Sequence, residues 1–437
     1  MRKTKPSNES FNSRRSFVKN GLQAAVAFTI IPRFVLGGKG YLPPSDRITL
    51  GFIGTGKQSK SLVKSFKDIA QTIAGADVDK QKLAAFQKIT EGYYADAAQK
   101  QSYKGFTAYA DFRQLLERKD IDAIVIATPD HWHAVNAVMA ANAGKHVYCE
   151  KPMAHTVEEG RAMVNAMKKN KVVFQTGSMQ RSWDKFRTAA ELVRNGYLGN
   201  IKEVLVNVGD PAIAFDLPGM PVPDYLNWND WVGPAVMTDY HTELSPPVTK
   251  DVYPNWRNYK EYGGGILSDW GAHMFDIAQW ALDMDKTGPV KYIPPTDANA
   301  KRGLTMIYEN GIVMKHEDFG RKWGVRFIGE KGTLDISRDY LDSNPANIAT
   351  ATLEPNAIRV YNSTNHYQDW LDCIKTGKEP ICGAETGHRS SSVCALANIA
   401  YWTKRPLEWD PKKEQFKNDA EANALVKARI RAPWKIV

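Results

Sequence analysis

The chain has 437 residues, of which 43% are hydrophobic and 24% charged, values typical of folded globular proteins with two or three domains. No run reaches the roughly 18–20 apolar residues that a membrane-spanning helix needs, so no span is expected. The net charge of +10 is concentrated in residues 1–36, where seven Lys and Arg face one acidic residue. The other basic residues are scattered and form no stripe with interleaved aromatics, so we expect no nucleic-acid partner.

The first residues have the features of a targeting segment. Residues 13–19 (SRRSFVK) resemble a twin-arginine export signal, and an apolar run at 21–31, ended by Pro32, suits its hydrophobic region. We therefore predict a signal at 1–36, a linker at 37–46, and export of the folded protein to the periplasm by the twin-arginine machinery. The alternative is a disordered basic tail.

Strand and helix patterns alternate through residues 47–176. Short apolar runs typical of buried parallel strands occur at 48–53, 69–76, 123–126, 146–149 and 172–175. The intervening helices have recognisable ends, including Asp111 as an N-cap, Gly144 after a helix at 133–143, and a capping box of Thr156 and Glu159. This alternation predicts an α/β domain with a doubly wound parallel sheet.

The first strand leads into Gly54-Thr55-Gly56, and the third glycine expected in G-x-G-x-x-G is replaced by Ser59. A strand, a glycine turn and a helix in this order bind the pyrophosphate of dinucleotides. Ser59 could fit the helix–strand contact, cap the helix or bond a phosphate. Asp77, 21 residues after Gly56, could accept hydrogen bonds from the ribose and repel a 2′-phosphate, which favours NAD over NADP. The alternative is a Rossmann-like domain without a nucleotide. The cofactor residues assigned here are Gly54, Gly56, Lys57, Gln58, Ser59 and Asp77.

Two further stretches, residues 127–152 (ATPDHWHAVNAVMAANAGKHVYCEKP) and 262–282 (YGGGILSDWGAHMFDIAQWAL), closely resemble the glucose–fructose oxidoreductase, inositol dehydrogenase and rhizopine-catabolism (Gfo/Idh/MocA) family. The resemblance implies an N-terminal Rossmann domain and a C-terminal α/β domain, at 177–437, with an open, largely antiparallel sheet. Its last helices could pack back on the N-terminal domain. Strand-like runs at 204–209, 304–308, 312–316 and 325–328 agree. In the family this sheet commonly forms the oligomer interface, which implies a homodimer or homotetramer.

The resemblance also implies the catalytic residues. Glu150-Lys151-Pro152 matches the family's E-K-P motif, and Lys151 could stabilise the oxygen of a reacting alcohol beside the nicotinamide. Asp269 and His273, spaced i, i+4, would share one helix face. His273 could take the hydroxyl proton, with Asp269 positioning the substrate or tuning the histidine. Gly263, Gly264 and Gly265, just before, would let the backbone approach a ligand. The alternatives are a surface lysine and a structural Asp/His pair.

Other residues are assigned to the site by their position in the same motifs. Thr128, Pro129, His131, Glu150 and Gln180 are expected at the cofactor, and Arg181 at the substrate. The H-x-H of His131 and His133 lacks a convincing third ligand, and the four cysteines have no zinc-like spacing, so we predict no metal and read the cysteines as buried small hydrophobes. Trp228, Trp256 and Arg257 suggest a sugar, because indole faces pack on the C–H faces of sugar rings; the alternative is that such tryptophans belong to a core or an interface.

These observations predict an NAD-dependent oxidoreductase acting on a ring hydroxyl of a sugar or glycoside, for example forming a 3-keto sugar. Free NAD should be scarce outside the cytoplasm, so an exported enzyme would need a tightly bound cofactor. One alternative is redox-neutral chemistry, in which an NAD-dependent glycosidase or lyase oxidises, eliminates and reduces. Another is a non-catalytic NAD- or sugar-binding sensor.

Overall fold

The computed structural model describes residues 47–96 and 103–437. The expected export signal at 1–36 and the linker at 37–46 lie outside the described residues. Residues 48–437 form one compact unit. Within the described ranges, no helix combines the length and the apolar composition required to cross a bilayer.

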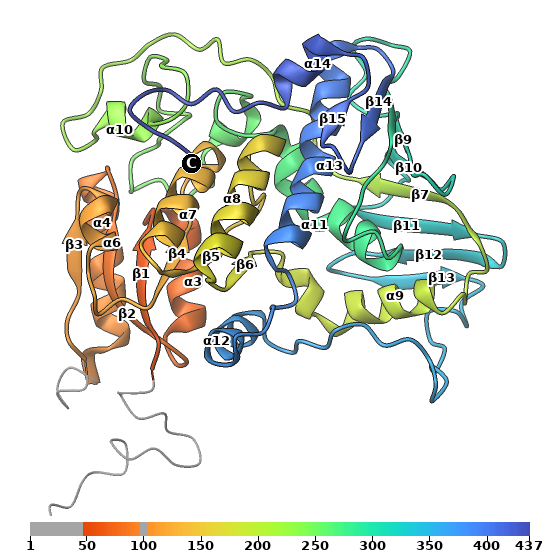
Figure 1. The fold of residues 1–437 in the computed structure, drawn as a ribbon, viewed down its shortest axis with the longest axis horizontal. Coiled ribbons are helices and arrows are strands. Elements are labelled where there is room, and N and C mark those ends of the chain that lie inside the picture. The colour runs from red at the N-terminus through yellow and green to blue at the C-terminus, as the bar shows by residue number, and fades with distance from the viewer. Residues whose placement is uncertain (1–46, 97–102) are drawn as a thin grey trace, which may run out of the picture. The chain divides into compact units, whose positions relative to one another are not determined.

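The N-terminal part is built on a six-stranded parallel sheet (Figure 1) with strand order β3-β2-β1-β4-β5-β6. Its strands are β1 (Thr49–Ile53), β2 (Gln71–Ala76), β3 (Thr107–Tyr109), β4 (Ala123–Ile126), β5 (His146–Cys149) and β6 (Phe174–Thr176). Its helices are α3 (Lys57–Phe66), α4 (Lys80–Tyr93), α6 (Phe112–Leu116), α7 (His133–Asn142) and α8 (Val157–Asn170). The predicted doubly wound sheet is confirmed. Strand β2 begins two residues later than expected because the N–H groups of Ile69 and Ala70 still bond to the Phe66 carbonyl.

Apolar residues fill both faces of this sheet. In β4, Ile124 and Ile126 join a core with α7 and α8, whereas Ala123 and Val125 join a second core with α3. Successive side chains of a strand point to opposite faces, so a strand buried on both sides must be apolar throughout. The second core is completed by Trp370 of α12 (His366–Thr376). A C-terminal helix therefore covers part of the Rossmann sheet.

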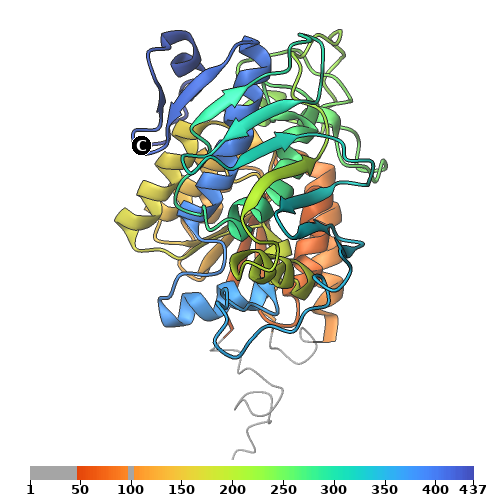
Figure 2. The ribbon, with the colours of Figure 1, turned by 90° about the vertical axis from the view of Figure 1, so that its right-hand side faces the viewer.

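The C-terminal part contains a nine-stranded sheet of order β13-β12-β11-β7-β10-β9-β8-β14-β15, in which only the β7–β10 pair is parallel. Figure 2 turns these strands toward the viewer. The strands are β7 (Ile201–Asn207), β8 (Lys291–Ile293), β9 (Leu304–Ile307), β10 (Val313–His316), β11 (Gly324–Gly329), β12 (Gly332–Ile336), β13 (Leu341–Asn344), β14 (Leu407–Asp410) and β15 (Gln415–Phe416). The expected largely antiparallel sheet is confirmed.

Helices pack on one face of this second sheet. Alternate strand residues such as Val204, Val206, Val325 and Phe327 form one core with helices α9, α11 and α13. The helices of this part are α9 (Asp184–Arg194), α10 (Trp228–Val232), α11 (Gly265–Ala281), α13 (Ala384–Thr403) and α14 (Ala420–Leu425), besides α12. Helix α11 carries Asp269 and His273, so this core fixes their position.

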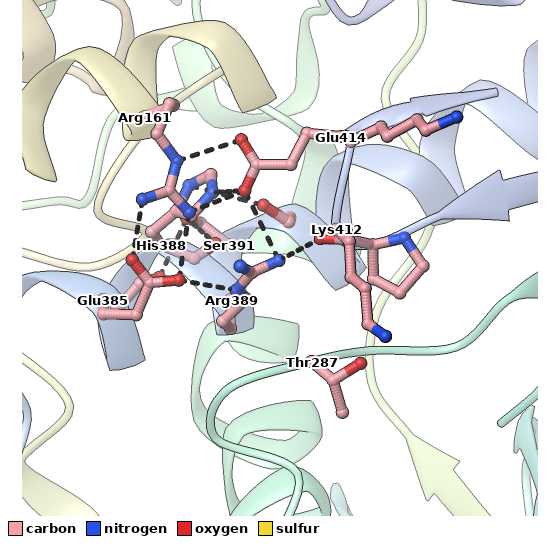
Figure 3. A network of polar contacts seen from close by, with 12 residues as sticks. Arg161, Thr287, Glu385, His388, Arg389, Ser391, Lys412 and Glu414 are labelled. Atoms are coloured by element: carbon pink, nitrogen blue, oxygen red, sulfur yellow. Dashed lines mark hydrogen bonds and ion pairs between the residues drawn. The ribbon is translucent and has the colours of Figure 1, made fainter. Parts of the chain in front are cut away.

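A charged network joins α8 of the Rossmann domain to the C-terminal part (Figure 3). Arg161 pairs with Glu385 of α13 at 2.7 Å and with Glu414 at 2.6 Å, and His388 Nε2 lies 2.7 Å from the same Glu414 oxygen. Burial opposes ionisation of Glu414, but the hydrogen bonds from His388 and Arg161 outweigh it and lower its pKa to about 2. The network holds the two halves in one relative position.

The chain after α14 returns to the Rossmann domain, and its end lies beside α7 in Figure 1. Trp434 packs against Trp132 and Phe112, with ring centroids 4.7 and 6.0 Å away, and Ile436 joins the core below α7. The four cysteines are free and buried, as expected.

Candidate active site

A cavity of about 510 Å³ lies between the two halves of the compact unit. One wall is the glycine turn and the carboxyl ends of β1, β2, β4 and β5, where ligands of parallel sheets bind. The other wall is the loop at 245–258 together with α11. Of the residues predicted for the site, the cavity is lined by Gly54, Gly56, Lys57, Gln58, Asp77, Thr128, Pro129, Glu150, Lys151, Trp256, Arg257, Asp269 and His273.

The glycine turn has the shape that a dinucleotide needs. Gly54 has φ +82°, and a Cβ there would lie 2.8 Å from backbone atoms of Ala127, so only glycine fits. A Cβ at Gly56 would meet nothing within 4 Å, so the backbone faces open space. The N-terminus of α3 follows, where backbone N–H groups can bind a phosphate. The turn thus fits a pyrophosphate.

Ser59 does not line the cavity. It is fully buried, and its hydroxyl donates a 2.6 Å hydrogen bond to the Gly54 carbonyl. Of the three roles considered, the structure shows packing between helix and strand, with an added bond that fixes the turn. The hydroxyl neither caps the helix nor faces a phosphate.

Asp77 ends β2 and lines the cavity. Its Oδ2 accepts from the N–H and the hydroxyl of Thr55 at 2.7 and 2.8 Å, and its Oδ1 accepts from the Asp79 N–H at 2.9 Å. A carboxylate offers about four acceptor positions, so one is left for a ribose hydroxyl. Asp77 and the glycine turn together fit an adenine dinucleotide.

A loop of the C-terminal half covers the glycine turn. Asp251 forms ion pairs with Lys57 at 3.2 Å and Lys60 at 3.6 Å, and the Tyr253 hydroxyl donates to Gln58 at 3.3 Å. Lys57 also lies 5.2 Å from the centre of the Tyr253 ring. These contacts place the loop over the part of the cavity that fits the cofactor.

Lys151 and Asp269 meet across the cavity. Lys151 Nζ donates to the Asp269 carboxylate and carbonyl, both at 2.7 Å, and Arg257 Nε lies 3.4 Å from the same carboxylate oxygen. Burial opposes ionisation of Asp269, but Lys151 and Arg257 outweigh it and lower its pKa. A carboxylate held between two cations orients the lysine that follows the fifth strand.

His273 faces the same part of the cavity. Its Nε2 accepts from Arg338 Nη2 at 3.1 Å, because a guanidinium has no acceptor. Its Nδ1 is buried and lacks a partner in the described structure. Burial, and then the charges of Lys151 and Arg338, lower the pKa of His273 well below its usual value. The imidazole is therefore neutral. Its Nε2 lone pair accepts from Arg338 and can act as a general base only when a substrate hydroxyl takes the place of Arg338.

Glu150 has a supporting position in the turn. It is 4% exposed, accepts from Gln58 Nε2 at 2.9 Å, and its backbone continues into the cis Lys151–Pro152 peptide. A side chain at Gly177 would lie 2.8 Å from its carboxylate. Burial raises the pKa of Glu150, partly offset by Lys151 and Gln58. Glu150 therefore links the glycine-turn helix to the lysine.

Five predicted site residues do not line the cavity: Ser59, His131, Gln180, Arg181 and Trp228. Arg181 is 1% exposed and pairs with Asp276 and Asp285 at 2.8 and 2.7 Å, so its donors are used inside the protein. His131 bonds the Trp231 carbonyl at 3.1 Å, and Trp228 stacks on Trp231 at 4.6 Å.

Gln180 and the three glycines at the start of α11, Gly263, Gly264 and Gly265, also do not line the cavity. Gln180 is 1% exposed, and its amide approaches the sulfur of Met274. A Cβ at Gly265 (φ +73°) would lie 2.4 Å from the Ala212 nitrogen, and one at Gly264 2.0 Å from the Ser268 hydroxyl. The expected close approach is therefore to the protein itself, which is a correction to the ligand contact expected of these glycines.

Several residues that line the cavity were not predicted from the sequence. They include Asp130, Asp251, Tyr253 and Arg338. Burial and the neighbouring Asp269 raise the pKa of Asp130 well above its usual range. Asp130 lies inside the 127–152 motif and could have been found there. Arg338 follows strand β12 and belongs to no motif, so only the fold brings it to His273.

Both halves of the chain match families of known proteins. Residues 48–178 match the family described as "Oxidoreductase family, NAD-binding Rossmann fold", and residues 212–436 match "Oxidoreductase family, C-terminal alpha/beta domain". These matches together cover most of the described chain.

Individual relatives are similar over parts of their length. A levoglucosan dehydrogenase of Pseudarthrobacter phenanthrenivorans is 37% identical over 43% of this chain and 39% of its own. A glycosyl hydrolase family 109 protein of Shewanella sp. strain ANA-3 is 41% identical over 27% of this chain and 25% of its own. The chain thus spans well under half of these two relatives.

Among solved structures, the WlbA dehydrogenase of Bordetella pertussis, in complex with NADH and UDP-GlcNAcA, shares the fold. Its TM-score is 0.58 at 19% identity, over 83% of this chain and 99% of that one. With the two family matches, these findings confirm the expected family: the chain belongs to the Gfo/Idh/MocA oxidoreductases and carries their NAD-binding Rossmann domain.

Proposed function

We propose that the protein is an NAD-dependent oxidoreductase acting on a ring hydroxyl of a sugar or glycoside. The observation that carries this proposal is the meeting of Lys151, Asp269 and His273 in the same cavity as the glycine turn and Asp77. Cofactor residues and an acid–base pair thus line one cavity. A binding protein would need no neutral histidine beside a lysine there.

The residues have distinct roles in this proposal. The substrate hydroxyl lies between Lys151 Nζ and His273 Nε2, and His273 takes the hydroxyl proton. Lys151 donates to the oxygen and stabilises its developing negative charge. Asp269 keeps Lys151 in place through the 2.7 Å contact. NAD, when bound, supplies the hydride acceptor.

A sugar-like substrate is supported by the lining and by a relative. Trp256, Arg257 and Trp270 border the cavity next to Asp269, which combines aromatic faces with hydrogen-bond donors. The relative named as a levoglucosan dehydrogenase acts, by its name, on an anhydrosugar. These features favour a polyhydroxylated ring over an apolar alcohol.

We propose NAD in preference to NADP, and tight retention of it. Asp77 supports the first point, because its carboxylate would repel a 2′-phosphate. The loop with Asp251 and Tyr253 supports the second, because it covers the glycine turn. Retention suits a protein that is exported folded.

Export by the twin-arginine route to the periplasm, and assembly into a homodimer or homotetramer, are part of the same proposal. The motif at 13–19 supports export. Cell fractionation of the wild type and of a variant with Arg14→Lys and Arg15→Lys tests it. We expect the wild type in the periplasmic fraction and the variant in the cytoplasmic fraction. The same distribution for both proteins would contradict export by this route. Light scattering of the purified protein gives the number of subunits.

A second candidate is redox-neutral cleavage of a glycosidic bond by transient oxidation. It is favoured by the similarity to a glycosyl hydrolase family 109 protein, 41% identical over 122 residues. Transient oxidation at C3 would acidify the neighbouring C–H, elimination would then break the glycosidic bond, and the ketone would be reduced back. The same Lys151 and His273 would serve both reactions.

The experiment that tests the proposal is a panel of sugars and glycosides incubated with purified protein and NAD, scored by product mass. A product 2 Da lighter, with NADH formed, supports the oxidoreductase. Release of aglycone without net redox change supports the second candidate. No product from any compound, with ligand binding intact, would contradict both.

A further inference from the structure

A row of indoles leads out of the cavity from His273. The Trp270 ring lies 5.7 Å from the His273 ring and lines the cavity, and the Trp323 ring lies 4.6 Å from Trp270. On the other side, the Arg338 guanidinium lies 4.5 Å from Trp270 and 5.6 Å from the Trp183 ring. We call Trp183, Arg338, Trp270 and Trp323 the aromatic row.

The outer members of the row are exposed. Trp183 is 38% and Trp323 37% exposed, although large aromatic side chains gain most by burial. They come from separate parts of the chain: Trp183 precedes α9, and Trp323 precedes β11. Trp183 and Trp323 do not line the cavity themselves, but each contacts a residue that does, Arg338 and Trp270 respectively. Two exposed indoles placed in this way at one cavity indicate a binding surface better than a stray surface residue does.

Arg338 is available to a ligand. Among the described residues, no carboxylate forms an ion pair with Arg338, and its Nε is buried without a hydrogen-bond partner. Its one side-chain hydrogen bond goes to His273. A guanidinium stacked between indoles but not neutralised can donate to the hydroxyl groups of a ring that lies on those indoles.

We propose that the aromatic row is a second sugar subsite, which binds the ring attached to the sugar that is oxidised. This inference rests on the proposed function, and it narrows the substrate from sugars in general to glycosides with at least two rings. The reacting ring lies between Lys151 and His273, and the attached ring extends over Trp270 toward Trp323 or Trp183, with Arg338 donating to its hydroxyls.

The position of the row explains why the attached ring matters for turnover. Trp270 is one residue after Asp269 and three before His273 on α11. A ring stacked on Trp270 would fix the reacting ring against both catalytic side chains. Binding energy from a remote ring then raises kcat as well as lowering KM.

The test measures kcat/KM for two forms of each active sugar: the methyl glycoside, which has one ring, and the disaccharide, which has two. Wild type should give a kcat/KM at least tenfold higher for the disaccharide. Trp323→Ala and Trp183→Ala, which alter exposed side chains and should fold, should reduce that ratio about tenfold. Tyr93→Ala, 39% exposed on α4 and outside the cavity, is the matched control and should keep the ratio.

Disaccharide titration followed by tryptophan fluorescence separates this inference from the proposed function. Turnover with a ratio near one, or a ratio that both tryptophan variants retain, overturns the subsite and leaves the oxidoreductase. If the disaccharide binds only when Trp183 or Trp323 is present, and no sugar is turned over, the subsite is supported and the oxidoreductase function is rejected. Neither binding nor turnover rejects both.

Discussion

Arg338 Nη2 lies 3.1 Å from His273 Nε2, the nitrogen that is proposed to take the substrate proton. The guanidinium can only donate, so His273 must carry its own proton on Nδ1 and remain neutral. A substrate hydroxyl must therefore replace Arg338 at Nε2. The freed guanidinium can then bond the substrate.

Removing this charge should shift the pH dependence of the reaction. Burial, Lys151 and Arg338 hold the pKa of His273 well below its usual value. The kcat/KM of the wild type should therefore stay near its maximum well below pH 6.5. Arg338→Gln removes a positive charge, which favours protonated His273 and raises its pKa. The acidic limb of kcat/KM should move to higher pH. Arg338→Lys keeps the positive charge, so its pH profile should stay near that of the wild type. If the acidic limb of kcat/KM does not move in Arg338→Gln, His273 is not the proton acceptor.

Catalysis and cofactor binding should separate by mutation. Lys151→Ala and His273→Ala should each lower kcat by about 10²–10⁴. The first removes the cation that stabilises the reacting oxygen, and the second removes the proton acceptor. The glycine turn and Asp77 are untouched, so the NAD dissociation constant, measured by fluorescence titration, should change little. Full activity in either variant would exclude that residue from the chemistry.

The loop over the glycine turn should slow cofactor release. Asp251→Ala removes the carboxylate that pairs with both Lys57 and Lys60, and exposed ion pairs of this kind are weak. NAD should therefore leave a few times faster in a stopped-flow displacement experiment. Asp68→Ala removes another surface ion pair, with Lys67, and serves as the control. Equal release rates in all three proteins would show that the loop does not retain NAD.

The network between the two halves should make stability depend on acidity. The folded-state pKa of Glu414, about 2, is below the ordinary 4.5, so ionised Glu414 stabilises the fold above pH 4.5. That contribution should disappear as the pH falls from 4.5 toward 2. Glu414→Gln should be less stable than wild type at neutral pH and lose less on acidification. Parallel unfolding curves for the two proteins between pH 5 and 3 would rule this contribution out.

Ser59 gives a local prediction. Its hydroxyl bonds the Gly54 carbonyl, and loss of one buried hydrogen bond costs about 1 kcal/mol. Ser59→Ala should therefore lower the unfolding free energy by roughly that amount and leave NAD retention after dialysis nearly unchanged. A large loss of retention at full stability would instead assign the hydroxyl to the cofactor.

Local patterns predicted much of this fold. Apolar runs located five of the six parallel strands; β3, which has no buried residue, was missed. Side-chain chemistry located the Asp111 and Thr156–Glu159 caps, which the structure confirms. Boundaries moved by one or two residues where a helix end continued into the next turn, as at Ile69. Spacing also placed Asp269 and His273 on one helix face, and both line the cavity, although their catalytic roles remain predictions.

Long-range pairing limited the rest. Arg181 was assigned to the substrate from its place after the last Rossmann strand, but Asp276 and Asp285, about a hundred residues later, bind it in the interior. Arg338 is 65 residues from His273 and lies on another element, so no local pattern joins them. The contacts of such residues can be assigned only from the tertiary structure.

In the proposed reaction, a hydride moves to NAD from the carbon of a sugar that is held between Lys151 and His273. The most direct measurement uses an active sugar deuterated at its ring carbons, with the mass of the NADH formed read by mass spectrometry. The NADH formed should be heavier by one deuterium, and Lys151→Ala and His273→Ala should each form this labelled NADH far more slowly. Oxidised sugar formed together with unlabelled NADH would contradict the proposed reaction.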